Sequence, residues 1–530
     1  MSATKNKLFY GDNLEVLRKY IKDDSVDLCY IDPPFNSKRT YNQIYNNVGN
    51  EDKAQAQAFV DTWTWNYIAN EGFDEIMGNK NGVFTKQSIN LILGLEKVLG
   101  KGSLLSYLVS MTQRIAEIYR ILKPTGSFYL HCDPTASHYL KLVLDTIFCS
   151  QGGDYRNEVR WKRQPVRGAK ATGYQYARNS DCILFYTKSN KSIWNNPYKQ
   201  YDENFIKNKF RKDGNGRYFR DCDLGDYSQN SIEKFEAEGR IYITKNGNKR
   251  LIRYLDEEKG EAIGDIWSDI AELNSMAKER LGYPTQKPEA LLERIIEASS
   301  NEGDLILDAY CGCGTTIAVA EKLKRNWIGI DITYQSISLI MKRLEDSFGK
   351  TALDNVVLTG IPEDFESAIA LANKQDDRLR KEFEKWVVLT YSKNRAIIND
   401  KKGGDGGIDG SVFMLDKDEE NKEAYKEVIF SVKSNKSLSP TVVRDLYGTM
   451  EREKAAIGYL LTLYAMPNLV KESAKYGNYE NKLVNQTYPK IEIICVEDIL
   501  QGKKMHLPTS LEVLKKAERK GGGDLPDIFG

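Results

Sequence analysis

With 530 residues, the chain is too long for one hydrophobic core, because single cores stop growing at roughly 250 to 300 residues. Apolar residues form 41% of it and charged residues 28%, which is typical of a folded soluble protein and excludes a chain that is disordered throughout. The 76 basic residues nearly balance the 75 acidic ones, so the net charge by itself indicates no nucleic-acid partner, and only local clusters can.

The N-terminal segment MSATKNKLFYGDN lacks the apolar stretch of a signal peptide, and no later apolar run reaches the roughly 18 residues that cross a bilayer. We therefore expect a cytoplasmic protein with no membrane partner. The eight cysteines are scattered, and we expect them to be reduced. Cys311 and Cys313 are the only close pair, which is a weak metal signal and is better explained by packing.

Three short apolar segments, each followed by a distinctive loop, predict buried β-strands. They are residues 26–31 before DPPF, 126–131 before CDPT and 304–307 before DAYCGCGTT. Strands of this kind, when helical patterns follow them, are typical of a parallel sheet that is covered on both sides. We predict an α/β protein with a doubly wound, Rossmann-like sheet. Ligands of such sheets bind at the carboxyl ends of the strands, where DPPF and DAYCGCG both fall.

Residues 161–281 are polar and rich in tyrosine, and they contain the basic runs RWKRQPVRGAK, FIKNKFRKDGNGRYFR and NGNKRLIR. One such run is usually a solvated loop. Three runs with interleaved aromatic residues favour a surface that contacts DNA. Further on, KQDDRLRKEFEKW predicts a linker helix, a second α/β pattern begins near Phe383, and the last residues predict a frayed tail.

The tetrapeptide Asp32-Pro33-Pro34-Phe35 offers a stiff set of acceptors at the end of a strand. Each proline fixes the backbone and removes a donor. The Asp32 carboxylate and the Pro33 carbonyl can accept both protons of an amino group, while the Phe35 ring can stack on a flat base. The tetrapeptide therefore suits the amino group of a flipped-out adenine or cytosine that attacks a methyl donor. Taken alone, it is equally well explained as a turn.

The segment that begins DLILDAYCGCGTT predicts a strand, a glycine turn, a helix and a second strand. Asp331 follows Asp308 by twenty-three positions, where an acidic residue commonly binds a ribose diol. Gly312 and Gly314 allow the backbone to approach a cofactor closely. Ile317 stands where a dinucleotide fingerprint has its third glycine. This substitution disfavours a cofactor with a pyrophosphate and favours S-adenosylmethionine, which has ribose and adenine but no phosphate.

Six segments, taken together and in this order, resemble the amino-group DNA methyltransferases of the circularly permuted β arrangement. They are GDNLEVL at 11–17, IDPPFNS at 31–37, GSFYLHCDPTASHYLKLVLD at 126–145, ILFYTKS at 183–189, YPTQKPEALLERII at 283–296 and DAYCGCGTT at 308–316. The resemblance covers about the first 350 residues. It implies a Rossmann-like methyltransferase sheet with an inserted target-recognition region, S-adenosylmethionine as the cofactor and double-stranded DNA as the partner.

The resemblance also implies roles for particular residues. It implies that the catalytic residues are Asp32, Pro33, Pro34 and Phe35. In the cofactor site, it places Asp12 near the adenine and Asp331 at the ribose. It places Asp308, Gly312, Gly314 and Thr315 at the methionine end of the cofactor, and Thr285 and Lys287 at the carboxylate. Lys287 has a direct physical reason as well, because a cation binds a carboxylate. Tyr310 and Cys311 depart from the usual family pattern, which affects packing more than chemistry.

In the family, an aspartate at the head of this loop is commoner in enzymes that methylate adenine N6, and a serine in those that methylate cytosine N4. The resemblance therefore implies adenine, with cytosine N4 as the alternative. His131 and His138 are candidate general bases. His131 directly follows a strand and His138 lies in a helix-like run, so we expect neither to be catalytic.

The C-terminal part pairs carboxylates with a lysine. Asp409 follows a glycine-rich turn, the β-like run VIFSVK ends in Lys433, and Glu384 is a third acidic candidate. Carboxylates that hold Mg²⁺ and a lysine that steadies charge suit a phosphodiesterase. This part resembles Mrr-type restriction endonucleases, an α/β fold of the PD-(D/E)xK class. Ser431 stands where that class has an acid or glutamine, so cleavage and a binding role without cleavage both stay open.

The expected boundaries follow from these segments. They are 1–160 for the catalytic part, 161–281 for the target-recognition insertion with the core strand ILFYTKS, 282–349 for the cofactor-binding part, 350–380 for a linker helix, 381–515 for the endonuclease-like domain and 516–530 for a flexible tail. We expect an adenine-N6 DNA methyltransferase of a restriction-modification system. The alternative from another class is chiefly a nuclease or DNA-binding protein with an accessory methyltransferase half. A homodimer remains open.

Overall fold

The computed structural model describes most of the chain. The described residues are 6–34, 39–44, 55–61, 63–163, 176, 179–244, 246–274, 277–281, 283, 285–373, 377–393, 395–399, 407–417, 423–505 and 507. They form two compact units, one of Met1–Ile193 with Ser268–Gly530 and one of Trp194–Trp267, which we call the large unit and the insertion unit. None of the helices described is long and apolar enough to cross a membrane.

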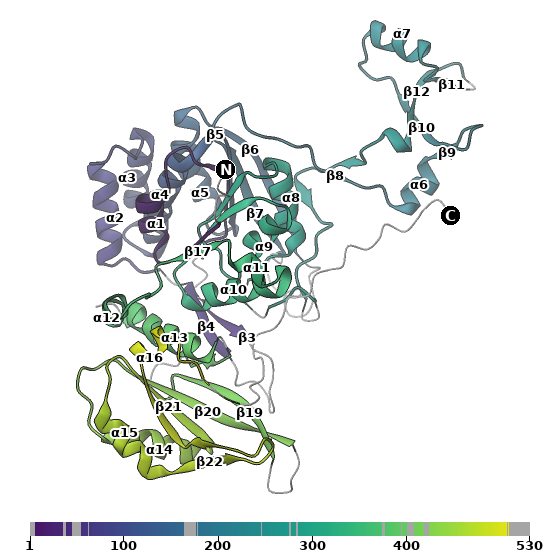
Figure 1. Cartoon of the computed structure of the whole chain (residues 1–530). Helices are drawn as coiled ribbons and strands as arrows, with labels where there is room; N and C mark the ends of the chain where they lie inside the picture. The colour runs from purple at the N-terminus through teal and green to yellow at the C-terminus, as the bar shows by residue number, and fades with distance from the viewer. Residues whose placement is uncertain are drawn as a thin grey trace. The chain divides into compact units, whose positions relative to one another are not determined.

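The large unit is built on a twisted sheet whose strand order is β6-β7-β5-β2-β15-β16-β1-β17 (Figure 1). The strands are β1 (Asn6–Tyr10), β2 (Val26–Ile31), β5 (Leu122–Cys132), β6 (Asp154–Lys162), β7 (Ser180–Thr187), β15 (Leu305–Asp308), β16 (Asn326–Asp331) and β17 (Val356–Thr359). The strands from β5 to β17 pair in parallel, whereas β7 and β6 pair antiparallel. The predicted doubly wound α/β fold is confirmed, with an antiparallel edge.

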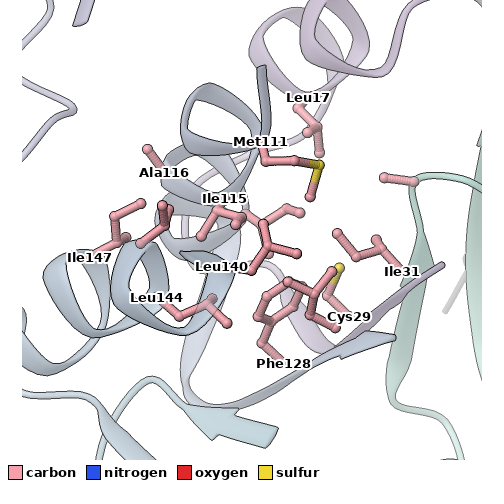
Figure 2. Packing of buried hydrophobic residues seen from close by; sticks show 14 of the residues in the cluster. Leu17, Cys29, Ile31, Met111, Ile115, Ala116, Phe128, Leu140, Leu144 and Ile147 are labelled. Carbon is pink, nitrogen blue, oxygen red and sulfur yellow. The ribbon is translucent and has the colours of Figure 1, made fainter. Parts of the chain in front are cut away.

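Helices cover both faces of this sheet, because its strands alternate apolar side chains between the two sides. One face carries α1 (Asn13–Tyr20), α4 (Ser103–Ile121) and α5 (Ser137–Ile147), with α2 (Tyr67–Gly78) and α3 (Lys86–Leu99) outside them, and the other carries α8 (Glu289–Ser299), α9 (Thr315–Lys322) and α10 (Tyr334–Phe348). Figure 2 shows Cys29, Ile31 and Phe128 of the sheet packed against Ile115 of α4 and Leu140 of α5. This core fixes the strand that ends at Asp32.

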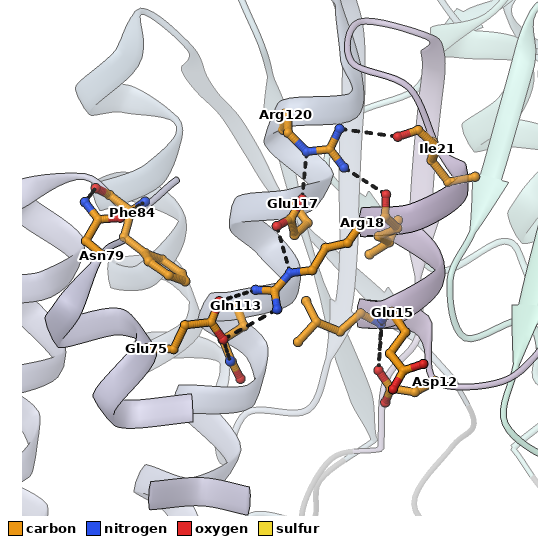
Figure 3. A network of polar contacts seen from close by, with 12 residues as sticks. Asp12, Glu15, Arg18, Ile21, Glu75, Asn79, Phe84, Gln113, Glu117 and Arg120 are labelled. Atoms are coloured by element: carbon orange, nitrogen blue, oxygen red, sulfur yellow. Dashed lines mark hydrogen bonds and ion pairs between the residues drawn. The ribbon is translucent and has the colours of Figure 1, made fainter. Parts of the chain in front are cut away.

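A buried carboxylate joins the helices on the first face (Figure 3). Glu117 of α4 accepts hydrogen bonds from Arg18 Nε of α1 at 3.0 Å and from Arg120 Nε at 2.7 Å. Glu75 of α2 accepts from Arg18 as well, and from Gln113 at 2.6 Å. A buried carboxylate that is paired on both oxygens contributes mainly by fixing the positions of its partners relative to one another. The network therefore fixes α1, which begins directly after Asp12.

Residues 350–380 differ from the expected linker helix. They form α11 (Lys350–Leu353), strand β17 and α12 (Phe365–Ala372). Strand β17 pairs in parallel with β1, with Asn6 opposite Val356. The short apolar run VVL therefore completes an edge of the main sheet instead of spanning two domains. The charged segment KQDDRLRKEFEKW does lie mostly in a helix, because its last ten residues, from Asp377 on, begin the long helix α13 (Asp377–Ser392).

The C-terminal region of the large unit holds a second sheet in the order β18-β19-β20-β21-β24. Its elements are β18 (Ile397–Ile398), β19 (Gly410–Lys417), β20 (Glu423–Lys433), α14 (Thr441–Glu453), β21 (Ile457–Thr462), α15 (Pro467–Ser473), β22 (Asn478–Asn481), β23 (Gln486–Pro489), β24 (Ile491–Cys495) and α16 (Val496–Leu500). Apolar side chains of β20, α14 and β21 form its core. The predicted second α/β domain is confirmed.

The insertion unit contains a small antiparallel sheet in the order β11-β12-β10-β9. Its elements are β8 (Tyr198–Lys199), α6 (Glu203–Lys209), β9 (Arg211–Lys212), β10 (Tyr218–Asp223), α7 (Gln229–Ala237), β11 (Ile241–Ile243), β12 (Lys249–Tyr254) and β13 (Glu261–Ala262). Residues 194–267 contain fourteen Lys or Arg and fourteen Asp or Glu. Two of the three basic runs, FIKNKFRKDGNGRYFR and NGNKRLIR, therefore belong to a unit with no net charge. The run RWKRQPVRGAK precedes this unit, and residues 164–170 of it lie outside the described residues.

The arginines of this unit are engaged in internal ion pairs. Each of the six arginines of the insertion unit, Arg211, Arg217, Arg220, Arg240, Arg250 and Arg253, lies within ion-pair distance of an acid of the same unit. Several also stack on aromatic rings, and the Arg217 guanidinium lies 3.8 Å from the centre of the Tyr254 ring. The predicted contact with DNA would therefore require these arginines to exchange partners.

Candidate active site

Four aspartates lie at the carboxyl ends of neighbouring parallel strands. Asp32 follows β2, Asp308 ends β15, Asp331 ends β16 and Asp12 comes two residues after β1. Adjacent strands are about 4.8 Å apart, so the strands of Asp32 and Asp331 lie about 10 Å from each other. The structure thus brings the DPPF segment and the glycine turn to one edge of the sheet, where ligands of such sheets bind.

Asp32 presents two different carboxylate oxygens. Its Oδ2 accepts a hydrogen bond from the Lys287 ammonium group, which also donates to the Thr285 carbonyl at 3.3 Å. Its Oδ1 is buried and has no hydrogen-bond partner among the described residues. A buried acceptor without a donor is costly, and an incoming N–H group would satisfy it. Pro33 and Pro34 follow, and Phe35 lies outside the described residues.

The glycine turn between β15 and α9 needs its glycines for two reasons. Gly312 and Gly314 have φ of +48° and +73°, which is a left-handed backbone that favours glycine. A Cβ at Gly314 would come within 2.7 Å of Ile340 Cγ1, and one at Gly312 within 3.2 Å of the Tyr283 ring. The turn therefore packs closely on Ile340 and Tyr283, and a side chain at either glycine would disturb this packing.

Two buried aspartates hold this turn. Asp308 accepts from Tyr310 N at 3.0 Å and from the Thr316 hydroxyl at 2.5 Å. Asp331 accepts from Gly312 N and Thr333 N, both at 2.9 Å. Burial raises the pKa of Asp308 to about 7 and the pKa of Asp331 to about 6, although these hydrogen bonds act in the opposite direction. The hydrogen bonds to both carboxylates therefore compensate in part for the hydration that their charged forms lose on burial.

Two of the predicted cofactor residues, Asp12 and Thr315, have structural roles of their own, and a third, Thr285, lies at the surface. Asp12 caps α1 by accepting from Leu14 N at 2.9 Å, and it also pairs with Arg114 at 2.8 Å. The Thr315 hydroxyl accepts from Arg343 at 3.2 Å inside the protein. Thr285 is exposed and has a φ of +61°. Their contact with a cofactor stays a prediction.

Some residues around the turn were missed by sequence reasoning. Arg343 of α10 is buried, donates to the Cys313 carbonyl at 3.2 Å and pairs with Glu289 of α8 at 2.7 Å. Asn13 donates to the Ala309 carbonyl at 2.8 Å. Arg343 lies twenty-nine positions after Gly314 on an otherwise ordinary helix, and no local signal could have identified it. The fold alone brings these side chains to the turn.

The C-terminal sheet brings together part of the predicted nuclease set. Burial, followed by the charge of Asp409, raises the pKa of Glu384 on α13 to about 7, and the charge of Lys433 is among those that oppose this rise. These three groups are therefore close enough to interact. Asp409 Oδ2 accepts from Val432 N at 2.6 Å, and Ser431 is buried in β20. Within the described ranges, no three His, Cys, Asp or Glu residues are grouped to hold a metal ion.

Comparison with known families identifies both halves of the chain. A family model described as DNA methylase matches residues 26–342, more than half of the chain. The chain belongs to the DNA methylase family. A second model, described as restriction endonuclease and named for the Mrr catalytic domain, matches residues 379–487. Both resemblances predicted from the sequence are confirmed.

Individual relatives are more distant. The type II methyltransferase M.EcaI of Enterobacter cloacae is 29% identical over 290 residues, which are 50% of this chain and 63% of M.EcaI. The DNA adenine methyltransferase YhdJ of Escherichia coli K12 is 46% identical over 119 residues, 21% of this chain and 40% of YhdJ. The solved PvuII DNA methyltransferase, cytosine-N4-specific, covers 67% of this chain and 92% of its own at 13% identity and a TM-score of 0.34. The chain spans less than two thirds of both curated relatives.

Proposed function

We propose that this chain is a site-specific DNA methyltransferase that transfers the methyl group of S-adenosylmethionine to N6 of adenine in double-stranded DNA, within a restriction-modification system. The observation that carries this proposal is the Oδ1 of Asp32, which is buried and has no hydrogen-bond partner within the described part of the chain. It lies at the end of β2, one strand from the glycine turn after β15 and two from Asp331. A fixed acceptor beside a cofactor turn is what methylation of an amino group requires.

The residues around the turn fit S-adenosylmethionine. Gly312 and Gly314 leave the backbone bare, Asp331 and Asp308 offer carboxylate acceptors for ribose hydroxyls and an ammonium group, and Lys287 offers a cation for a carboxylate. No part of this donor set requires a phosphate. When bound, the cofactor would supply a methyl group on a positively charged sulfur, and the carboxylates along this edge favour that charge.

The protein groups then hold the amino group. Asp32 Oδ1 would accept one N–H and the Pro33 carbonyl the other, so that the nitrogen lone pair points toward the methyl group. Asp32 is also placed to receive the proton that the nitrogen loses after transfer. Phe35 is expected to stack on the base.

The choice of adenine rests on the aspartate that heads the loop and on the likeness to YhdJ, whose name states adenine specificity. To test it, DNA is incubated with tritiated S-adenosylmethionine and digested to nucleosides for mass spectrometry. We expect N6-methyladenine. N4-methylcytosine alone would establish the alternative. Asp32→Ala should abolish labelling, whereas Asp74→Ala, an exposed aspartate on α2, should not; label that persists in Asp32→Ala would refute the site.

We further propose that the C-terminal domain cuts DNA with Mg²⁺. Asp409 supports this proposal, because its Oδ2 accepts from Val432 N at 2.6 Å and it is thereby held beside the end of β20, where Lys433 follows. The charges of both residues act on Glu384. Two carboxylates can hold Mg²⁺ when water and phosphate oxygens complete its shell, and Lys433 would steady the charge that develops at the phosphate. Ser431 supplies a hydroxyl where the class has a charge.

Cutting is tested on unmethylated DNA in Mg²⁺. Lys433→Ala should abolish cutting and keep methylation, whereas Lys436→Ala, an exposed lysine three positions on, should retain both. If the native chain cuts no DNA in Mg²⁺ or Mn²⁺, the domain is a binding module. Cutting without any methyl transfer would instead establish the alternative, a nuclease with an accessory methyltransferase half.

A further inference from the structure

A chain of buried polar side chains runs beneath the catalytic loop. The Tyr30 hydroxyl of β2 lies 2.9 Å from His131 Nδ1 of β5, and His131 Nε2 lies 3.2 Å from Asp181 Oδ2 of β7. Arg163, just after β6, lies 3.3 Å from Asp181 Oδ1. The chain thus connects four neighbouring strands, and its first member stands two residues before Asp32.

These groups share the face of the sheet on which Asp32 lies. Side chains alternate along a strand, so Tyr30 and Asp32 point to one side while Cys29 and Ile31 point into the apolar core of Figure 2. His131 is fully buried, and its ring packs edge-on against Trp161 at 5.8 Å between ring centres. No atom of His131 can reach a substrate, so it is not a general base.

The hydrogen-bond directions along the chain are determined by its ends. Burial raises the pKa of Asp181, but the hydrogen bond and charge of His131 and the charges of Lys287 and Arg163 outweigh this and lower it overall. Asp181 is therefore an ionised acceptor, and His131 Nε2 donates to it. The Tyr30 hydroxyl is the hydrogen-bond partner of the other ring nitrogen, Nδ1. Burial and the Asp32 charge raise the pKa of Tyr30, which keeps it a donor.

Stability alone does not explain such a chain. Buried polar groups of this kind are often replaced by apolar residues of similar size without loss of stability, and on the opposite face of β2, β5 and β7 the residues Cys29, Leu130 and Leu184 belong to an apolar core. Polar groups in a shell behind a site commonly fix the orientation of the groups that do the chemistry. Lys287, which binds Asp32, is also one of the charges that act on Asp181.

We propose that Tyr30, His131 and Asp181 form a positioning relay for methyl transfer. The relay fixes the end of β2, so that Asp32 directs its unpartnered Oδ1 toward the amino group. His131 is the central positioning residue, because it bonds to both neighbours at once. This inference rests on the proposed function of Asp32 and adds three residues to its site.

The test compares two tyrosine variants of the full chain. Tyr30→Phe removes the first hydroxyl of the relay. Tyr129→Phe is the matched control, because Tyr129 is equally buried in β5 and its hydroxyl also makes one buried hydrogen bond, to Ser299 at 2.7 Å. We expect Tyr30→Phe to lower the single-turnover rate at saturating cofactor and DNA about ten- to a hundredfold, with unchanged cofactor affinity. Tyr129→Phe should lower it less than about threefold.

A double-mutant cycle adds a measurement that a merely structural role would not affect. Asp181→Asn keeps the shape of the side chain and removes its charge. If Tyr30 and Asp181 act in one relay, the double variant of Tyr30→Phe and Asp181→Asn should lose clearly less rate than the product of the two single losses. The double variant of Tyr129→Phe and Asp181→Asn should lose the product of its two single losses. If Tyr30→Phe does not fold, Asp181→Asn against Tyr129→Phe makes the same rate comparison.

The outcomes separate the two proposals. Equal rates for Tyr30→Phe and Tyr129→Phe in an active enzyme overturn the relay and leave the proposed function intact. Multiplicative losses in the cycle overturn it as well. A native chain that transfers no methyl group overturns the proposed function, and the relay with it.

Discussion

At the scale of single residues, the site is dominated by carboxyl groups in unusual surroundings. Asp32 has one oxygen with no hydrogen-bond partner among the residues that the structure describes. Asp308 and Asp331 are buried and accept hydrogen bonds from the glycine turn and its neighbours. Burying a carboxylate costs free energy unless hydrogen bonds or nearby positive charges compensate for the lost hydration. The concentration of these aspartates at one edge of the sheet is therefore typical of a binding site rather than of a structural core.

The raised pKa of Asp308 predicts a pH dependence of stability. Its value of about 7 in the folded chain lies above the ordinary 3.8, so the folded state binds more protons between these values and its stability falls as pH rises from about 4 to about 7. Relative to Asp308→Asn, the native chain should lose up to about 4 kcal/mol over this range. Urea unfolding of both proteins at pH 4.5 and 8 checks this. A constant difference would contradict it.

At the scale of elements, the glycine turn and the insertion unit differ in the contacts that hold them together. The turn is close-packed, with Ile340 and Tyr283 directly beneath its two glycines. The insertion unit is open and is held largely by ion pairs and aromatic contacts, with exposed helices α6 and α7. Rigidity thus lies where a cofactor would be held, and exchangeable charges lie where DNA contact is predicted.

Gly314→Ala should damage the turn. A Cβ there would lie 2.7 Å from Ile340 Cγ1 on a backbone with φ of +73°, and the left-handed conformation alone costs roughly 1 to 2 kcal/mol. We expect a clear loss of cofactor affinity by calorimetry. The control is Gly448→Ala on α14, where an added Cβ meets nothing within 4 Å, and a gain of roughly 0.5 to 1 kcal/mol in stability is expected. Equal affinities for both variants would argue against a cofactor at this turn.

Removing one acid of the insertion unit should strengthen DNA binding. Asp223 is largely exposed and pairs with Arg250 at 2.7 Å. Asp223→Asn leaves that arginine freer to bind a phosphate, so affinity in gel-shift assays should rise severalfold at low salt, with a steeper salt dependence. The control is Glu15→Gln on α1, which makes the same charge change at an exposed pair with Lys19. A similar gain in both variants would show only a general charge effect.

At the scale of the whole molecule, the two family regions meet within the large unit. Glu382 of α13 is buried and accepts from Tyr334 N, the first residue of α10, at 2.8 Å. Tyr334 also packs edge-on against Tyr10 and bonds to Thr390 of α13 at 3.1 Å. An acid from the endonuclease-like region thus caps the helix that follows Asp331, so the stabilities of the two regions are linked.

Glu382→Ala should weaken this link. It removes the acceptor for a buried N–H at the start of α10, which costs about 1 to 2 kcal/mol, and the thermal unfolding temperature measured by calorimetry should fall by a few degrees. Glu366→Ala, an exposed acid in the first turn of α12, should change it very little. An unchanged unfolding temperature for Glu382→Ala would show that the contact contributes nothing.

The sequence by itself determined the doubly wound sheet, the strand ends that carry Asp32, Asp308 and Asp331, and the resemblance of both regions to their families. It could do so because apolar strands, glycine turns and strand-end loops are local patterns. It failed at residues 350–380, where the run VVL was too short to identify as the edge strand β17. It also suggested a basic surface, whereas equal numbers of acidic and basic residues leave the insertion unit without net charge.

Only the tertiary structure decided which side chains meet. Lys287 reaches Asp32 across 255 positions, Arg343 supports a turn nearly thirty positions away, and Tyr30, His131 and Asp181 join three strands. None of these contacts has a local signal, because the register of parallel strands and the packing of helices on the sheet bring the groups together. The sequence shows the chemical character of each residue, but it does not show which other side chain that residue contacts.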